Sequence, residues 1–328
     1  MIMKMKRYTI MMSLATVLLG LMSCSSEEDS GNMAKTADLQ LTTEISTTRS
    51  IIEGETFSYG DVVQIYVSGE AEGKNFAWAY NDAGKWIIDP TIKLNNNHVG
   101  VVGVANLLNR DITPDEKGDQ SDILLGLPTL ADNTYITAAN PVVPMKFHHV
   151  LARVSFQLKQ TGGSDQLTRL SLKNIDNGNA ITVQCDSMKV VEAARWASEY
   201  MIGNPNYSQL WKAFEERILS YLYTNRIPAD LTLNKTVTLS EETQTIDLLV
   251  IPTSINSYNR VALELTIGGN AYSIELPYTS WNSNVRYVYP VNIDTSKDMP
   301  VSINIDKTTI ERWNYNGKQN IEETWPLD

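Results

Sequence analysis

The stretch RVALELTIGGNAYSIEL, residues 260–276, has a strong β-strand pattern. Apolar side chains occupy every second position on either side of Gly268-Gly269-Asn270. A period of two places alternate side chains on opposite faces of a strand, and a glycine pair between two such runs is typical of a hairpin turn. The stretch therefore predicts a β-hairpin whose apolar side chains share one face. These are Val261, Leu263, Leu265, Ile267, Tyr272, Ile274 and Leu276.

Short apolar runs separated by turn residues extend in both directions from this hairpin. Strands are expected at 62–67, 76–88 (a hairpin turning at 82–84), 99–108, 123–127, 144–159, 167–175, 181–187 and 285–293. Many short strands with frequent turns predict an all-β fold of β-sandwich domains. The turn Gly162-Gly163-Ser164-Asp165 is the expected domain boundary. It divides the chain into an N-terminal sandwich at 50–162 and a C-terminal sandwich at 163–328.

The long strand at 144–159 changes its pattern in the middle. Met145 and Phe147 are apolar at odd positions, whereas apolar residues from Val150 onward fall at even positions. A change of parity moves the buried set to the other face of the strand. We therefore expect a β-bulge or a sharp twist at His148-His149.

A helical insertion is expected at about 189–226, within the C-terminal sandwich. In SQLWKAFEERILSYLYTNR, residues 208–226, apolar and aromatic residues recur at helical spacing. Such a stripe indicates a helix with one buried face. A ligand-binding aromatic box is the alternative.

The first 23 residues have the features of an export signal. Three basic residues precede an apolar run that ends at Cys24, and this order is typical of a secretory signal peptide. LMSC, residues 21–24, resembles the lipobox of bacterial lipoproteins, which implies cleavage before Cys24 and lipidation of its sulfur. An ordinary secretory signal next to a chance cysteine is the alternative. Cleavage leaves 305 residues, a length that suggests two domains.

The mature chain would be strongly acidic. Without Lys4, Lys6 and Arg7 it has 24 basic and 38 acidic side chains, a net charge of −14. That balance argues against nucleic acid and anionic membrane surfaces as partners. The tract SSEEDSGN, residues 25–32, is expected to be a flexible tether. It also resembles the acidic surface-export signal of lipoproteins in Gram-negative anaerobes, with a plain linker as the alternative.

The tether leads into ADLQLTTEISTTRS, residues 37–50, in which a strand pattern ends at an isolated arginine. Odd-numbered residues from Ala37 to Ile45 are apolar or threonine, and the even-numbered ones are polar. The pattern predicts a half-buried strand. Between Lys35 and Lys74, Arg49 is the only basic residue. Residues 24–49 are thus expected to form an acidic tether followed by a separate N-terminal strand.

Catalytic motifs are absent from the sequence. It has three histidines, and it contains no GxSxG, HExxH, P-loop or CxxC pattern. The acidic cluster at 115–122 lacks the residue order of an EF-hand loop, so we interpret it as a solvated loop. The sequence therefore predicts neither an enzyme nor a cofactor or metal site.

The ordered segments of the chain resemble the fimbrillin family, which comprises type V pilins and their accessory subunits. A lipobox cysteine is followed by a strand ending in TTRS and then by IIEGETFSYGDVVQIYV, residues 51–67. SDILLG (121–126), KFHHVLARVSFQL (146–158) and WNSNVRYVYPVNI (281–293) are similar to later segments of the family. The resemblance implies two tandem transthyretin-like β-sandwiches and a surface pilus subunit. The helical insertion departs from the plain sandwich and leaves open a stalk, tip or anchor role.

The resemblance also implies an assembly route. Family precursors are outer-membrane lipoproteins that an arginine-specific protease cuts, here expected between Arg49 and Ser50, and the product enters the fimbrium with other pilin subunits. The cut would release a groove-plugging strand, whose apolar residues are Ala37, Leu39, Leu41 and Ile45. A donor strand from 297–328 of a neighbouring subunit would then fill the groove, with Trp313 and Trp325 as candidate anchors. Alternatively, Arg49 is a chance basic residue, and each tryptophan covers its own domain.

The main competing hypothesis is a glycan-binding protein that stays lipid-anchored on the outer membrane. Trp78 and Trp86 lie near the predicted hairpin at 82–84 and would be its sugar platforms. A permanently tethered binding protein has no need of a removable strand that ends in arginine. The strand before Arg49 therefore favours the pilus subunit.

Overall fold

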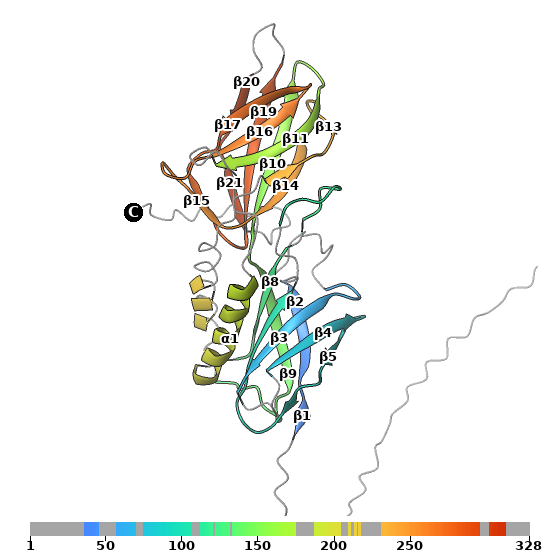
Figure 1. Ribbon diagram of the computed structural model, residues 1–328, viewed down its shortest axis with the longest axis vertical. Helices are drawn as coiled ribbons and strands as arrows, with labels where there is room; N and C mark the ends of the chain where they lie inside the picture. The colour runs from blue at the N-terminus through green and yellow to red at the C-terminus, as the bar shows by residue number, and fades with distance from the viewer. Residues whose placement is uncertain are drawn as a thin grey trace, which may run out of the picture. The chain divides into compact units, whose positions relative to one another are not determined.

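The computed structural model of the protein describes most of the residues between 36 and 312. The described ranges are 36–45, 57–69, 75–105, 112–120, 122–131, 133–174, 187–204, 209–210, 213–214, 216–217, 231–295 and 302–312. They form many β-strands and one long helix (Figure 1), which confirms the predicted all-β class with a helical insertion. No helix among them is long and apolar enough to cross a membrane.

The first half of the chain forms a seven-stranded sheet. In sheet order its strands are β2 (Gln40–Ile45), β9 (Val142–His149), β8 (Leu124–Pro128), β7 (Gly100–Ala105), β3 (Val62–Ser68), β4 (Phe76–Asp82) and β5 (Lys85–Asp89). Neighbouring strands are antiparallel except β2 and β9, which run parallel. The short strand β1 (Ala37–Asp38) pairs instead with β6 (Lys93–Leu94). The hairpin predicted at 82–84 joins β4 and β5.

This sheet curls so that its two end strands, β2 and β5, lie next to each other. Its inner face holds Phe57, whose ring makes edge-on contacts with Trp86 and Phe147 at centroid distances of 5.1 and 5.0 Å. Gly103 and Gly126 pass directly over the Phe147 ring, because a Cβ atom at either position would come within 2.8 Å of it. The inner core therefore depends on β5 and β9 as well as on the central strands.

The chain leaves this sheet at His149 and enters another one at β10 (Ala152–Thr161). The long strand predicted at 144–159 is thus two strands in two sheets, and the parity change at His148-His149 marks the crossing. The strand pairing changes at 150–151, before the domain boundary expected at 162–163, which lies in the turn between β10 and β11 (Gln166–Asn174). At the crossing, the His149 ring Nδ1 bonds the Asp122 carboxylate, and both side chains are buried.

The second half forms a β-sandwich. One sheet has the order β14 (Gln244–Val250), β10, β19 (Val285–Asp294), β20 (Ser302–Ile305), and β21 (Thr309–Arg312) also pairs with β19. The other has the order β12 (Leu231–Leu233), β11, β16 (Val261–Ile267), β17 (Asn270–Glu275), and β13 (Val237–Thr238) also pairs with β11. Buried residues of both sheets belong to one core, among them Phe156, Leu172, Leu263 and Tyr289. A two-stranded ribbon of β15 (Thr253–Ile255) and β18 (Thr279–Trp281) adjoins them.

The hairpin predicted at residues 260–276 is confirmed as β16 and β17. Leu263 lies opposite Ile274, and Leu265 lies opposite Tyr272. Gly268 and Gly269 have φ values of +56° and +81°. Two consecutive positive φ angles are the geometry of a type I′ turn, which L-residues with side chains adopt only with strain.

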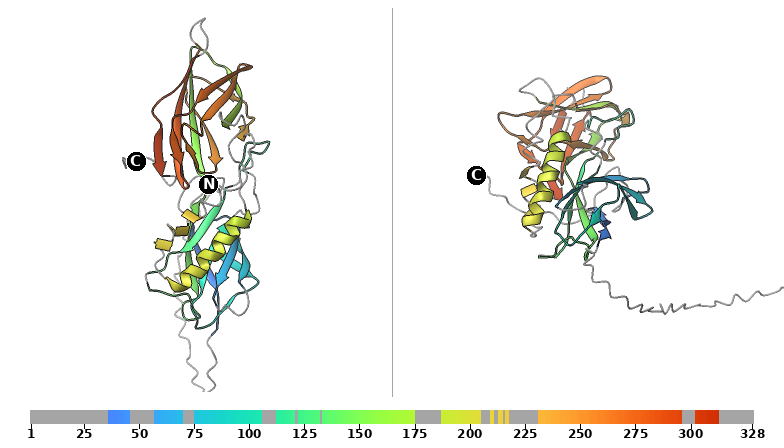
Figure 2. Two further views of the ribbon diagram at one scale, coloured as in Figure 1. Left: turned by 60° about the vertical axis from the view of Figure 1, so that its left-hand side comes forward. Right: turned by 60° about the horizontal axis from the view of Figure 1, so that its bottom comes forward.

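The helix α1 (Ser187–Gly203) follows β11 in sequence but packs on β3 and β7 of the first sheet (Figures 1 and 2). Its buried side chains recur at helical spacing, and they are Val190, Ala193, Ala194, Ala197, Ser198 and Met201. Small residues let the helix approach closely, and the Ser198 hydroxyl lies 2.5 Å from that of Ser68 on β3. The described residues between 209 and 217 are also helical, with Leu210 and Phe214 buried. The insertion predicted within the C-terminal sandwich therefore covers the N-terminal sheet.

Candidate functional site: the β2 edge

The segment 37–45 is held by backbone hydrogen bonds to two other stretches of the chain, 92–94 and 141–147. β2 pairs with β9 over six residues, from Gln40 opposite Val142 to Ile45 opposite Phe147. The Leu39 N–H donates to the Ile92 carbonyl, and the Gln40 N–H donates to the Pro141 carbonyl, each at 2.9 Å. Because β2 is last in its sheet, no strand of the described part of the chain forms a ladder on its other side. It is an edge strand.

Alternate side chains of this segment lie in the core. The exposed fractions of Leu39, Leu41 and Ile45 are 4%, 7% and 2%, whereas Ala37 is half-buried. The side chains of Gln40, Thr42 and Glu44 face outward and are exposed. These burials follow the period of two in the sequence. Removing the segment would therefore uncover three aliphatic positions and the backbone of β9 together.

Charged side chains add two exposed ion pairs along the same segment. Lys93 Nζ lies 3.5 Å from the Asp38 carboxylate, and Lys146 Nζ lies 3.7 Å from that of Glu44. Exposed pairs of this kind contribute about 0–1 kcal/mol each. They favour the observed register, but the apolar side chains supply most of the attachment.

Trp86 closes the open side of β2. Its indole N–H donates to the Thr43 hydroxyl at 3.1 Å, and its ring is 8% exposed. A buried indole in this position cannot serve as a sugar platform, so the role considered for Trp86 in glycan binding is wrong. Trp78 is half-buried on the face of β4 opposite to the buried residues Ala77 and Ala79. Its ring lies edge-on to the Phe76 ring at a centroid distance of 5.4 Å.

The other predicted site residues lie outside the described residues. They are Cys24, Arg49, Ser50, Trp313 and Trp325. The start of the expected donor region, however, is described. β20 and β21 run antiparallel along one side of β19, so residues 302–312 form an edge of the C-terminal sandwich. Ile303 and Ile305 are half-buried, and Ile310 is 47% exposed.

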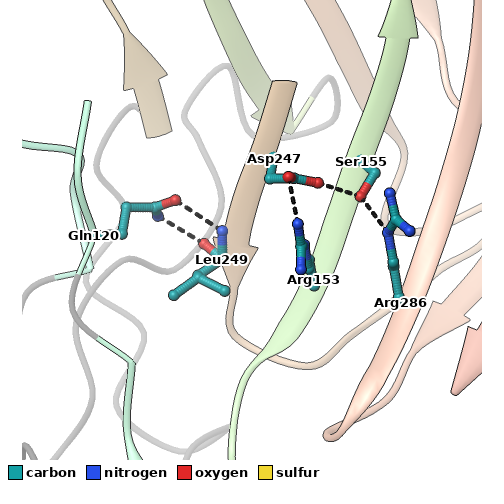
Figure 3. Close-up of polar contacts among 6 residues, drawn as sticks. All are labelled: Gln120, Arg153, Ser155, Asp247, Leu249 and Arg286. Carbon is teal, nitrogen blue, oxygen red and sulfur yellow. Dashed lines mark hydrogen bonds and ion pairs between the residues drawn. The ribbon is translucent and has the colours of Figure 1, made fainter. Parts of the chain in front are cut away.

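A polar cluster that no sequence pattern predicts lies on the first sheet of the C-terminal sandwich (Figure 3). Arg153 Nη2 donates to Asp247 Oδ2 at 2.5 Å, the Ser155 hydroxyl donates to Asp247 Oδ1, and Arg286 Nε donates to Ser155 Oγ at 2.8 Å. Burial raises the pKa of Asp247, but hydrogen bonds and charge from Arg153, with help from Ser155 and Arg286, outweigh burial and lower it. The carboxylate therefore stays charged and joins β10, β14 and β19.

Gln120 is a second residue whose contacts the sequence pattern does not predict. Its side-chain amide, in the segment before β8, bonds the backbone of Leu249 on β14 (Figure 3). A glutamine in a polar loop has no pattern that distinguishes it, because the partner lies 129 residues away. Among the described residues, no group of three or more His, Cys, Asp and Glu side chains comes together as a metal site.

Comparison with known proteins gives one match in sequence and several in structure. The model of the fimbrillin-like family matches residues 48–313. No curated protein matches the chain in sequence.

Three solved structures that match this chain are distant from it in sequence. A protein from Bacteroides uniformis assigned to cell adhesion has 14% identity and a TM-score of 0.46, covering 85% of this chain and 99% of its own. The tip fimbrial protein Mfa3 from Porphyromonas gingivalis, truncated at its C-terminus, has 13% identity and a TM-score of 0.42, with coverages of 84% and 100%. A fimbrial protein from Bacteroides vulgatus has 11% identity, a TM-score of 0.42 and coverages of 84% and 99%. Since the family model spans most of the sequence, the chain belongs to the fimbrillin-like family.

Proposed function

We propose that the protein is a structural, adhesive pilus subunit that polymerises by exchange of the β2 strand after a cut at Arg49–Ser50. Membership of the fimbrillin-like family supports the general role, which is a non-enzymatic subunit of a cell-surface fimbrium that assembles with other pilin subunits. The observation that carries the finer proposal is the β2 edge strand. It is buried on one face, shares its backbone ladder with β9 alone among the described strands, and ends four residues before Arg49.

The burial energy of residues 39–45 is large enough that a subunit without them would need a replacement strand. Burial of a leucine or isoleucine side chain contributes about 1.5–3 kcal/mol, so Leu39, Leu41 and Ile45 together contribute about as much as the 5–15 kcal/mol by which a typical domain is stable. A subunit that lost the segment would expose the core surface that these three side chains cover, together with the backbone groups of β9 that pair with β2. An extended strand from another subunit would restore both the burial and the ladder hydrogen bonds.

The donor is expected within 297–328, in line with the edge position of β20 and β21. Among the residues that the structure describes, these strands pair only with β19, and their isoleucines are partly exposed. A segment of this kind can leave its own sandwich with little loss of core. Head-to-tail donation leaves one free groove at the end of each assembly, so it produces an open filament. Trp313 and Trp325 remain the proposed anchors of the donor.

Anchoring before the cut is assigned to Cys24. The proposed precursor is an outer-membrane lipoprotein held at the cell surface by this lipidated cysteine, and an arginine-specific protease releases it into the fimbrium. Cys24→Ala should abolish lipid labelling of the precursor. Incorporation of label into that variant would contradict this part of the proposal.

The test of polymerisation is limited digestion of purified precursor with an arginine-specific protease, followed by N-terminal sequencing and by gels of unboiled samples. We expect a new N-terminus at Ser50 together with a ladder of oligomers. Arg49→Ala should fold normally but remain uncut and monomeric, whereas Arg169→Ala, at an exposed position on β11, should behave like the wild type. A monomer that keeps residues 37–45 after digestion would contradict the proposal and favour a permanently anchored glycan-binding protein.

A further inference from the structure

Gln120 makes the contacts of a peptide group with its side chain. The Leu249 N–H donates to Gln120 Oε1 at 2.8 Å, and Gln120 Nε2 donates to the Leu249 carbonyl at 2.9 Å (Figure 3). The same Nε2 donates to the Ile112 carbonyl at 2.6 Å. The side chain is buried, with 5% exposed. A primary amide therefore bonds both backbone groups of Leu249, as a paired strand residue would.

Leu249 belongs to the free edge of a sheet. β14 is the last strand of its sheet and pairs with β10 on its other side. In an antiparallel pair, residues alternately direct their backbone groups toward the partner and away from it. Because Leu249 directs both groups toward Gln120, the alternation places the backbone groups of Asp247 and Thr245 on the same open side. Within the described part of the chain, these two residues have no second strand beside them.

An edge of this kind is a template for another chain. An added strand would form its ladder with backbone N–H and C=O groups that point away from β10. These groups belong to every second residue of β14, namely Thr245, Asp247 and Leu249. Because Gln120 already bonds Leu249, the backbone groups of only Thr245 and Asp247 remain for an added strand along the described edge. Asp247 and Arg153 form a charged pair beside it, which is another feature that discourages strand addition.

We propose that Gln120 is an edge guard, which keeps β14 from accepting an extended strand of a second copy of this chain. Its amide occupies the position of the incoming peptide group, so a second copy can add a full ladder only after displacing it. Gln120 thus excludes from β14 a strand of a second copy that would bind through backbone hydrogen bonds. The inference is independent of the proposed cut at Arg49 and of lipid anchoring, because it concerns the uncut chain and a different sheet.

The test uses Gln120→Leu in the full uncut chain, with Gln166→Leu as the matched control. Gln166 is an exposed residue at the start of β11. Light scattering after size-exclusion chromatography, over a hundredfold range of concentration, measures association. Amide hydrogen exchange at Leu249 measures the protection of its N–H by Gln120. Exchange at Leu248 and Val250, whose backbone groups point toward β10 by the same alternation, measures the integrity of the sandwich.

We expect Gln120→Leu to accelerate Leu249 exchange at least tenfold at low concentration and to form dimers or larger species as concentration rises. Unchanged exchange at Leu249, or faster exchange in a protein that stays monomeric throughout, would overturn the guard. Should Leu248 and Val250 also lose protection, Gln120→Glu replaces the test variant. It retains the acceptor for the Leu249 N–H and removes both donated bonds, so it should associate more weakly than Gln120→Leu but more strongly than the control. A monomeric Gln120→Glu protein would equally overturn the inference.

Discussion

The indole of Trp86 on β5 and the hydroxyl of Thr43 on β2 form a hydrogen bond that joins the two ends of the seven-stranded sheet. The bond is 3.1 Å long, and the Trp86 ring also contacts the Phe57 ring, which in turn contacts the Phe147 ring. β2 is consequently held by β9 through its backbone and by β5 through a side chain. The strand proposed to leave during assembly thus has a second attachment, which can be altered without changing the β9 ladder.

Thr43→Val should weaken this attachment while keeping the size of the side chain. Loss of one hydrogen bond, with the Trp86 N–H left buried, should lower the free energy of unfolding by about 1–2 kcal/mol. Chemical denaturation of the uncut protein measures the loss. If the proposed strand exchange operates, the cut variant should also form oligomers faster than the wild type. An unchanged unfolding midpoint would mean that the bond contributes nothing to holding β2.

Leu41→Ala should lower the free energy of unfolding by about 2–3 kcal/mol, because it removes a buried side chain from the edge strand. Thr42→Ala, at the next position but exposed, should change it by less than about 0.5 kcal/mol. Denaturant titration of the two variants measures this contrast. Equal effects at positions 41 and 42 would contradict the burial pattern of β2.

Gly100→Ala tests the close packing of helix α1 against β7. A Cβ atom at this position would lie 1.8 Å from the Ser198 carbonyl oxygen and 3.1 Å from Met201 Cβ, so the helix must move away from β7. Overpacking of this kind costs about 1–3 kcal/mol, and we expect the upper end because the obstacle is backbone. Thermal unfolding measures the effect, with Glu199→Ala on the exposed side of α1 as the control. Wild-type stability in Gly100→Ala would show that α1 does not pack against β7 as described.

His148 should make the protein less stable in mild acid. Burial, with smaller contributions from the charges of Lys146 and His149, lowers the pKa of His148 from 6.5 to about 4. The unfolded chain therefore binds a proton at a higher pH than the folded chain, so the stability conferred by a neutral His148 is complete above about pH 6.5 and falls as the pH drops toward 4. The loss attributable to this group should be at most about 3 kcal/mol.

Denaturant titrations between pH 7 and pH 4 measure this loss. His148→Gln should flatten the dependence, since its side chain does not titrate. His98→Gln, at an exposed position, should leave it unchanged. If the His148 variant keeps the full pH dependence, other groups are responsible for it.

Local features of the fold could be predicted from the sequence, whereas contacts between distant segments could not. The alternation at 37–45 and around Gly268-Gly269 predicted strands with the correct buried faces, because a period of two follows from backbone geometry. The parity change at His148-His149 identified the correct place but the wrong cause, since a bulge and a crossing between sheets alter the pattern in the same way. A helical insertion was expected at about 189–226, and α1 (Ser187–Gly203) overlaps the first part of that range. Its packing on β3 and β7 depends on tertiary structure, which the local pattern does not show.

The candidate site divides in the same way. Leu39, Leu41 and Ile45 could be identified from one strand, but Trp86 could not be recognised as its partner, because an aromatic residue near a hairpin turn is equally compatible with an exposed position. Gln120 and the Asp247 cluster depend on register between segments more than 90 residues apart. For these residues, the side-chain type alone carries no information about the partner.

The position of α1 in the chain has a consequence for the order of folding. The sheet that it covers is complete in sequence at His149, yet its cover does not exist until Gly203 has been made, and the intervening strands β10 and β11 belong to the other sandwich. During synthesis or secretion the N-terminus emerges first. The faces of β3 and β7 that α1 covers therefore stay exposed until about fifty residues beyond His149 have emerged. The two halves of the protein therefore mature together, and a nascent chain that stops short of the helix leaves the earlier half unfinished.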